Sequence, residues 1–229
     1  MKKTCARLGS TLLAAALMLS LTPAAFAIGV ESKSPDDFVD LDPNAWYAQA
    51  AAYTLEHGIL SGTGPDTFSP EDTLTRAMAV QMVYAMDGKP NVGSHTYGDV
   101  SYDAWYDDAV AWAASKNIMY GYQEGRFFPD DPITRAQLAT ILWRADGSPA
   151  VSSQTAFADQ GSIPSYAVSA VAWTRNEGII NGRDGNLFDP DGSASRAQVA
   201  AILYRYLNSG AGNTPAAETT LTTNGGEEI

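Results

Sequence analysis

Three arginines recur at equivalent places in the chain, and their type and position suit the binding of an anion. Each follows a hydroxyl residue that is a good helix N-cap, and the same apolar pattern begins after each. The pairs are Thr75-Arg76, Thr134-Arg135 and Ser195-Arg196. Because a helix N-terminus already carries about half a positive charge, an arginine there has no local electrostatic advantage. Its repetition predicts an anion, such as a carboxylate on a sugar, held by the guanidinium fork and by free N–H groups of the helix.

A carboxylate of the chain itself is the alternative partner for these arginines. Two sets of aspartates recur with them, one shortly before each arginine and one farther upstream. The first set is Asp72, Asp131 and Asp191, and the second is Asp40, Asp99 and Asp159. Both interpretations hold together if an aspartate orients an arginine that also binds a ligand.

The arginines belong to a unit of about 45 residues that occurs three times. An aromatic-x-Asp motif, a glycine, a Phe-x-Pro motif and the arginine follow in the same order at steps of 59 to 61 residues. The glycines are Gly62, Gly121 and Gly182. They most simply serve a turn, although a glycine also lets a ligand approach the backbone closely. We assign the repeats to residues 37–87, 96–146 and 156–207.

The first half of each repeat is typical of a helix with a defined end. Its apolar positions fall on one helical face in the second repeat. A glycine or asparagine then stands where a left-handed residue ends a helix, before a hydrophobic residue. These residues are Gly58, Asn117 and Gly178. We expect the larger aromatic residues to pack in the core, with stacking on sugar rings as the alternative. They are Trp46, Tyr53, Trp105, Trp112 and Trp173.

The second helix of each repeat opens at the hydroxyl cap. Gln137 and Gln198 predict capping boxes, whereas Met78 cannot form one in the first repeat. An apolar stripe at i, i+3, i+4 and i+7 follows in all three copies. A single helix pair has too little core to fold alone, so we expect a mainly α-helical, pseudo-threefold domain. The three stripes would form a central three-helix bundle with one repeat in each arm; an open solenoid is the alternative.

The two ends of the chain differ from the repeats. Residues 1–27 combine a basic start, an uncharged apolar run and Ala25-Phe26-Ala27. This pattern predicts a secretory signal peptide cleaved before Ile28. A retained membrane anchor is the alternative, although the run is short for a bilayer span. Residues 208–229 lack aromatic residues and periodicity and indicate a flexible, Thr-rich tail.

The composition argues against several classes of function. Fourteen basic and 26 acidic residues give a formal charge of −12. Loss of the signal peptide removes three basic residues, which leaves 11 − 26 = −15. This acidity opposes nucleic-acid binding and attraction to anionic membranes. One cysteine and two histidines leave little material for disulfides, zinc sites or a catalytic triad. We expect no metal site, no cofactor and no enzymatic activity.

The aromatic-x-Asp start, the Phe-x-Pro motif and the Thr-Arg-Ala-Gln segment together resemble the S-layer homology (SLH) repeat, over about residues 37–207. The resemblance implies a three-armed spindle in an exported bacterial protein of the cell surface. It also implies non-covalent binding of an anionic secondary cell-wall polysaccharide, such as a pyruvylated glycan, in grooves between arms. The implied contacts to the pyruvyl ketal are Arg76, Arg135 and Arg196. The neighbouring candidates for ligand binding are Thr75, Thr134, Ser195, Gln137, Gln198, Gly62, Gly121 and Gly182.

Several positions depart from the family pattern and leave other functions open. Met78, Gln137 and Gln198 replace the acid that ends the arginine motif, and Tyr166 stands near the place of a tryptophan. Ser195 also replaces the usual threonine, so equal binding by all three grooves is not expected, and repeat 3 departs most from the pattern. An envelope protein-interaction or assembly module is the alternative function, and a wall-lytic enzyme is the third. The oligomeric state stays open.

Overall fold

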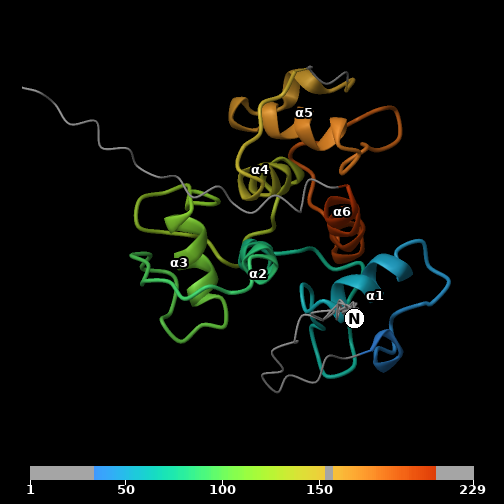
Figure 1. Ribbon diagram of the computed structural model, residues 1–229, viewed down its shortest axis with the longest axis horizontal. Helices are drawn as coiled ribbons and strands as arrows, with labels where there is room; N and C mark the ends of the chain where they lie inside the picture. Colours follow the sequence, from blue (N-terminus) through green and yellow to red (C-terminus); the bar gives the residue numbers. More distant parts are fainter. Residues whose placement is uncertain (1–33, 153–156, 210–229) are drawn as a thin grey trace, which may run out of the picture. The chain divides into compact units, whose positions relative to one another are not determined.

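Helices carry the repeats, as the sequence predicts (Figure 1). The computed structural model describes residues 34–152 and 157–209, so the predicted signal peptide and nearly all of the predicted tail lie outside the described residues. The α-helices are α1 (Ala48–Glu56), α2 (Arg76–Met86), α3 (Asp107–Ser115), α4 (Arg135–Ala145), α5 (Val168–Asn176) and α6 (Arg196–Asn208). Short 3₁₀ helices are η1 (Pro35–Asp37), η2 (Gln160–Ser162) and η3 (Ser165–Ala167). The described residues form no extended strand, which confirms the mainly helical class.

The first helix of each repeat ends as the sequence predicts. Asn117 has a φ of 58°, in the left-handed region that asparagine and glycine tolerate. The N–H of Ile118 donates to the carbonyl oxygen of Ala113 at 2.8 Å, which closes the last turn of α3. Gly58 and Gly178 adopt the same conformation after α1 and α5. The chain therefore takes the same local conformation at the ends of all three helices.

The second helices begin at the three predicted caps. The side chain of Thr75 accepts a hydrogen bond from the N–H of Met78. In repeats 2 and 3 the bond is reciprocal: Gln137 accepts from the N–H of Thr134, and Gln198 from the N–H of Ser195. The two predicted capping boxes are confirmed. Their effect is to place each arginine at the first position of its helix.

The arms, in contrast, are not built as the sequence predicts. We expected one repeat in each arm, but α3 packs on α2, α5 on α4, and α1 on α6. The first helix of repeats 2 and 3 therefore packs on the second helix of the preceding repeat. In repeat 1 the first helix, α1, packs on α6 of repeat 3, which closes the ring. The prediction was wrong because helical periodicity shows which face of a helix is apolar but not which helix covers it.

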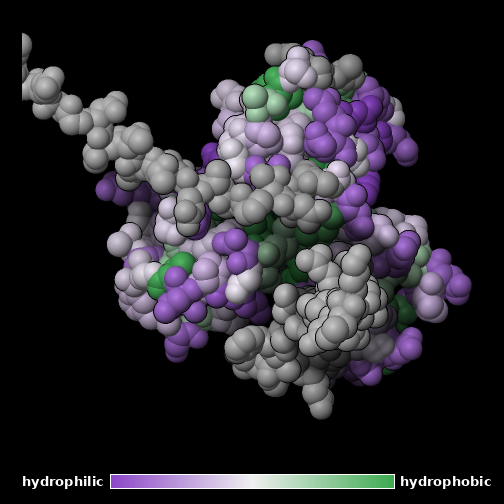
Figure 2. Space-filling model, in the orientation of Figure 1, coloured by the Kyte–Doolittle hydropathy of each residue, from purple (hydrophilic) through white to green (hydrophobic). Residues whose placement is uncertain are grey.

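The core lies where the inner helices α2, α4 and α6 approach one another. Their predicted apolar stripes are buried, among them Met82, Ile141 and Leu203. The segments before the helices also join, because Leu74 donates its N–H to Ala194 and accepts one from Ile133. On the face seen in Figure 2, hydrophobic residues show mainly between the helices, while hydrophilic residues cover most of the outside. None of the described helices combines the length and apolarity needed to cross a membrane.

The large aromatic residues divide between core and surface. Trp112 and Trp173 are buried, as predicted. Trp46 and Trp105 are 68% and 61% exposed, so the core interpretation was wrong for these two. Both precede the first residue of their helices, α1 and α3. A helical face assigned from the spacing therefore does not extend to them.

Candidate functional site

The three repeated arginines are buried, with 2 to 4% of each residue exposed. Each donates through Nε to the main-chain oxygen of the phenylalanine in a Phe-x-Pro motif of another repeat. Arg76 reaches Phe127 at 3.0 Å, Arg135 reaches Phe188 at 2.7 Å, and Arg196 reaches Phe68 at 2.7 Å. The order is cyclic, because repeat 1 binds repeat 2, repeat 2 binds repeat 3, and repeat 3 binds repeat 1. The arginines therefore join the repeats as well as being candidates for ligand binding.

The loop that each arginine binds also forms hydrogen bonds with the aspartate of the aromatic-x-Asp motif. The carboxylate of Asp99 accepts the N–H groups of Phe127 and Phe128, both at 2.8 Å. Asp40 and Asp159 make the same pair of hydrogen bonds in repeats 1 and 3. Although burial raises the pKa of Asp99, the hydrogen bonds from these main-chain groups and the nearby Arg126 lower it overall. The motif thus fixes the carbonyl that the arginine binds.

The first main-chain N–H groups of the inner helices have acceptors within the protein. Arg76 and Ala77 donate theirs to the carbonyl oxygens of Asp131 and Pro129, both at 2.9 Å. Equivalent bonds hold the starts of α4 and α6. The expectation that free N–H groups of the helix help to hold an anion was therefore wrong. Sequence periodicity did not reveal that a neighbouring loop supplies these acceptors.

Carbonyl oxygens, rather than carboxylates, accept the hydrogen bonds of the arginine side chains. The repeated aspartates act at longer range. Burial lowers the pKa of Arg76 to about 10, and the charges of Asp131 and Asp99 partly oppose this shift. Burial also lowers the pKa of Arg135 and Arg196, each with two aspartates acting in the opposite direction. The aspartates therefore offset part of the cost of burying a cation.

The surroundings of the three arginines differ at the residue that follows the repeated glycine. At Arg76 this residue is Tyr122, whose ring centre lies 4.6 Å from the guanidinium carbon. In repeat 3, whose loop Arg135 binds, the equivalent residue is Arg183, and in repeat 1, whose loop Arg196 binds, it is Thr63. None of these three residues belongs to a motif that repeats in the sequence. The sequence does show that the residue after the repeated glycine differs in each repeat, and this variation is the signal that could have drawn attention to it.

Tyr166 brings the third repeat to the site at Arg76. It is half exposed, it forms a hydrogen bond with the side chain of Thr134, and its pKa responds to the charge of Arg76. Burial raises that pKa, while the hydrogen bond and the nearby arginines lower it. The charge of Arg76 therefore acts on a residue of the third repeat as well as on residues of the second.

The repeated glycines have an internal packing role. A Cβ atom at Gly121 would lie 1.7 Å from the carbonyl oxygen of Arg126. At Gly62 and Gly182 it would lie 2.5 Å and 2.7 Å from the rings of Phe38 and Phe157. Glycine suits these turns because a side chain would overlap with neighbouring atoms of the crowded loop.

The comparisons with known proteins agree with these repeats. The family model described as S-layer homology domain matches residues 37–79, 96–139 and 156–200. The chain is 31% identical over 176 residues to an amylopullulanase of Thermoanaerobacterium thermosulfurigenes, which covers 74% of this chain and 9% of that protein. It is 27% identical over 172 residues to the surface-layer 125 kDa protein of Lysinibacillus sphaericus, covering 73% and 15%. It is 29% identical over 170 residues to a cellulosome-anchoring protein of Acetivibrio thermocellus, covering 69% and 37%.

The chain matches only a part of each of these relatives, between 9% and 37% of their length. Proteins with very different names thus share the region of the repeats. The similarity to the amylopullulanase gives this chain no catalytic residue.

Proposed function

The chain belongs to the S-layer homology domain family, and on this premise we propose that it is a cell-wall anchoring module that binds an anionic wall polysaccharide without a covalent bond. The observation that carries the proposal is the threefold family match, which spans the described repeats. A surface-layer protein and a cellulosome-anchoring protein share this region. The protein is accordingly placed at the bacterial cell surface.

The arginine sites support an anionic ligand. Arg76, Arg135 and Arg196 are buried guanidinium groups that reach the boundaries between repeats. We assign them the anionic group of the polymer, and a pyruvyl ketal carboxylate suits the planar fork of an arginine. The caps Thr75, Thr134 and Ser195, with Gln137 and Gln198, hold the helices that carry these arginines. The acidity of the chain opposes long-range attraction, so recognition is short-range.

Co-sedimentation with purified bacterial sacculi tests the function. We expect the protein to pellet with intact sacculi and to stay in solution after mild acid has removed acid-labile polymers and ketals. A digest of peptidoglycan alone, without attached polymer, serves as the control. Equal pelleting before and after acid treatment would contradict the polysaccharide proposal and favour a protein partner in the envelope. Release of soluble muropeptides would instead indicate a wall-lytic enzyme.

A further inference from the structure

We propose that the three arginine sites are unequal and that the site at Arg135 is the principal one for the anionic group of the ligand. This inference rests on the proposed function and says which of the three sites holds the ligand most tightly. It follows from the hydrogen-bond partners of the three guanidinium groups and from the charges around them. The ligand class is an oxyanion, such as a carboxylate, that can accept two parallel N–H bonds.

The terminal nitrogens of the three arginines have different partners. Nη2 of Arg76 donates to the carbonyl oxygen of Tyr120 at 2.9 Å. Nη2 of Arg196 donates at 2.5 Å to Ser61, the residue equivalent to Tyr120 in repeat 1. At these two sites the protein itself engages half of the fork as well as Nε.

The equivalent carbonyl at the third site has a different donor. It belongs to Asn181, and Nη1 of Arg175 donates to it. In the part of the chain that the structure describes, neither terminal nitrogen of Arg135 has an acceptor, and only its Nε is bonded. Although Arg135 as a whole is only 4% exposed, its terminal nitrogens are not among the buried atoms that lack a partner, so they keep some access to solvent. An oxyanion bound there would supply the charged acceptor that the protein does not give these two nitrogens.

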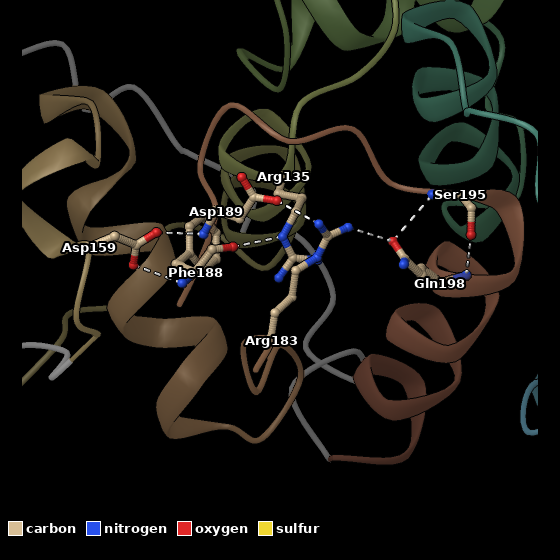
Figure 3. A network of polar contacts seen from close by, with 7 residues as sticks. All are labelled: Arg135, Asp159, Arg183, Phe188, Asp189, Ser195 and Gln198. Atoms are coloured by element: carbon tan, nitrogen blue, oxygen red, sulfur yellow. Dashed lines mark hydrogen bonds and ion pairs between the residues drawn. The ribbon is translucent and has the colours of Figure 1, made fainter. Parts of the chain in front are cut away.

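Two more arginines surround Arg135. Figure 3 shows the guanidinium group of Arg183 near that of Arg135, between Asp189 and Gln198. Nη1 of Arg183 pairs with the Asp189 carboxylate at 2.6 Å, and Nη2 lies 3.5 Å from Oε1 of Gln198. Arg205 is also close enough for its charge to act on Arg135.

The balance of charge singles out this site. The charged groups that act on Arg135 are Arg183 and Arg205, which oppose its charge, and Asp189 and Asp159, which favour it. With Arg135 itself the sum is +3 − 2 = +1. Around Arg196 only Asp72 and Asp40 act, and the sum is +1 − 2 = −1.

The site at Arg76 has the same sum as that at Arg196, +1 − 2 = −1, and differs from it in its aromatic surroundings. Asp131 and Asp99 act on Arg76, and its guanidinium carbon lies over the rings of Tyr122 and Phe127. These rings and the carbonyl oxygens occupy much of the space around the guanidinium. An incoming anion thus meets a free fork and an excess of positive charge only at Arg135.

The proposal is tested by isothermal titration calorimetry with wall polymer and the protein as it is secreted. We expect Arg135→Gln to weaken binding by about tenfold or more, because a charge-assisted fork is lost. Arg76→Gln and Arg196→Gln, checked for folding by circular dichroism, should weaken it by about threefold or less. An equal loss in Arg135→Gln and Arg76→Gln would overturn the ranking. Polymer stripped of ketals by mild acid, or of phosphodiesters by hydrofluoric acid, identifies which oxyanion is bound.

A second variant and a second measurement keep the test valid if Arg135→Gln does not fold. Arg183→Thr replaces an exposed arginine by threonine, the residue type that Thr63 has at the equivalent position of repeat 1. The change removes one cation from the site. It should keep the fold and weaken binding by about threefold or more; unchanged affinity would contradict the proposal. In the wild-type protein, NMR titration with sulfate should shift the Nε–H signal of Arg135 before those of Arg76 and Arg196. Sulfate binding at Arg135 without polymer binding would refute the proposed function but leave this site standing.

Discussion

Arg196 donates its Nε–H to the carbonyl oxygen of Phe68 at 2.7 Å across 128 residues of chain. The bond joins the last repeat to the first, and α1 packs on α6 beside it. The three repeats therefore form a closed ring rather than a row with two free ends. The solenoid alternative is contradicted by this contact, because a solenoid joins each repeat only to its sequence neighbours.

The ring closure predicts that Arg196 contributes to the stability of the whole repeat region. Arg196→Gln leaves buried carbonyl oxygens without their charged donor, so we expect the free energy of unfolding to fall by about 2–4 kcal/mol. Urea unfolding followed by circular dichroism measures the change. Arg126→Gln is the control, since its side chain is 59% exposed and its loss should cost about 0.5 kcal/mol or less. Equal effects of the two variants would contradict the closure.

Gly121 should be intolerant of any side chain. In Gly121→Ala the new Cβ would overlap the carbonyl oxygen of Arg126, and the loop that Arg76 binds would have to move. We expect a loss of about 3 kcal/mol in thermal or urea unfolding. Gly93→Ala is the matched control, because a Cβ there has no atom within 4 Å. If both variants unfold alike, crowding is not the reason for the glycine.

Asp99 should contribute stability that is lost in acid. Its pKa is lowered in the folded protein, so its contribution is fully present above the unfolded pKa of about 3.9 and is lost as the pH falls below that value. We expect Asp99→Asn to cost about 1–2 kcal/mol at pH 7 and less near pH 3. Urea unfolding between pH 7 and pH 3 measures both values. A difference from wild type that stays constant with pH would contradict the role of the charged carboxylate.

Asp146 should have the opposite dependence on pH. Burial, with a contribution from the charge of Glu177, raises its pKa to about 6 despite the hydrogen bond from Tyr206. The folded protein then binds the proton more tightly than the unfolded chain, so stability is present below about pH 3.9 and lost as the pH rises through 6. Asp146→Asn should remove this decline and stabilise the protein at pH 7 by about 1 kcal/mol, a value reduced for solvent screening. Thermal unfolding from pH 4 to pH 7 measures this dependence. If Asp146 were not responsible, Asp146→Asn would lose stability with rising pH as the wild-type protein does.

The sequence determined the local features because their causes lie within a few residues. A hydroxyl cap and a glutamine three positions later are enough to start α4 and α6. Asn117 and the glycines at equivalent places end the outer helices through bonds within the same turn. The predicted apolar stripes face the core for the same reason, since helical period alone sets which residues share a face.

The tertiary structure decided which helix covers which and what each arginine binds. Three nearly identical stripes can be paired within a repeat or between repeats, and the pairing depends on long-range packing that periodicity does not contain. The three arginines look alike in sequence, yet only Arg135 keeps both terminal nitrogens free of acceptors among the described residues. The reason is the carbonyl of Asn181, which accepts from Arg175 and so from a helix more than thirty residues beyond Arg135. Repetition in the sequence therefore indicated where the candidate sites lie, and contacts between distant repeats made those sites unequal.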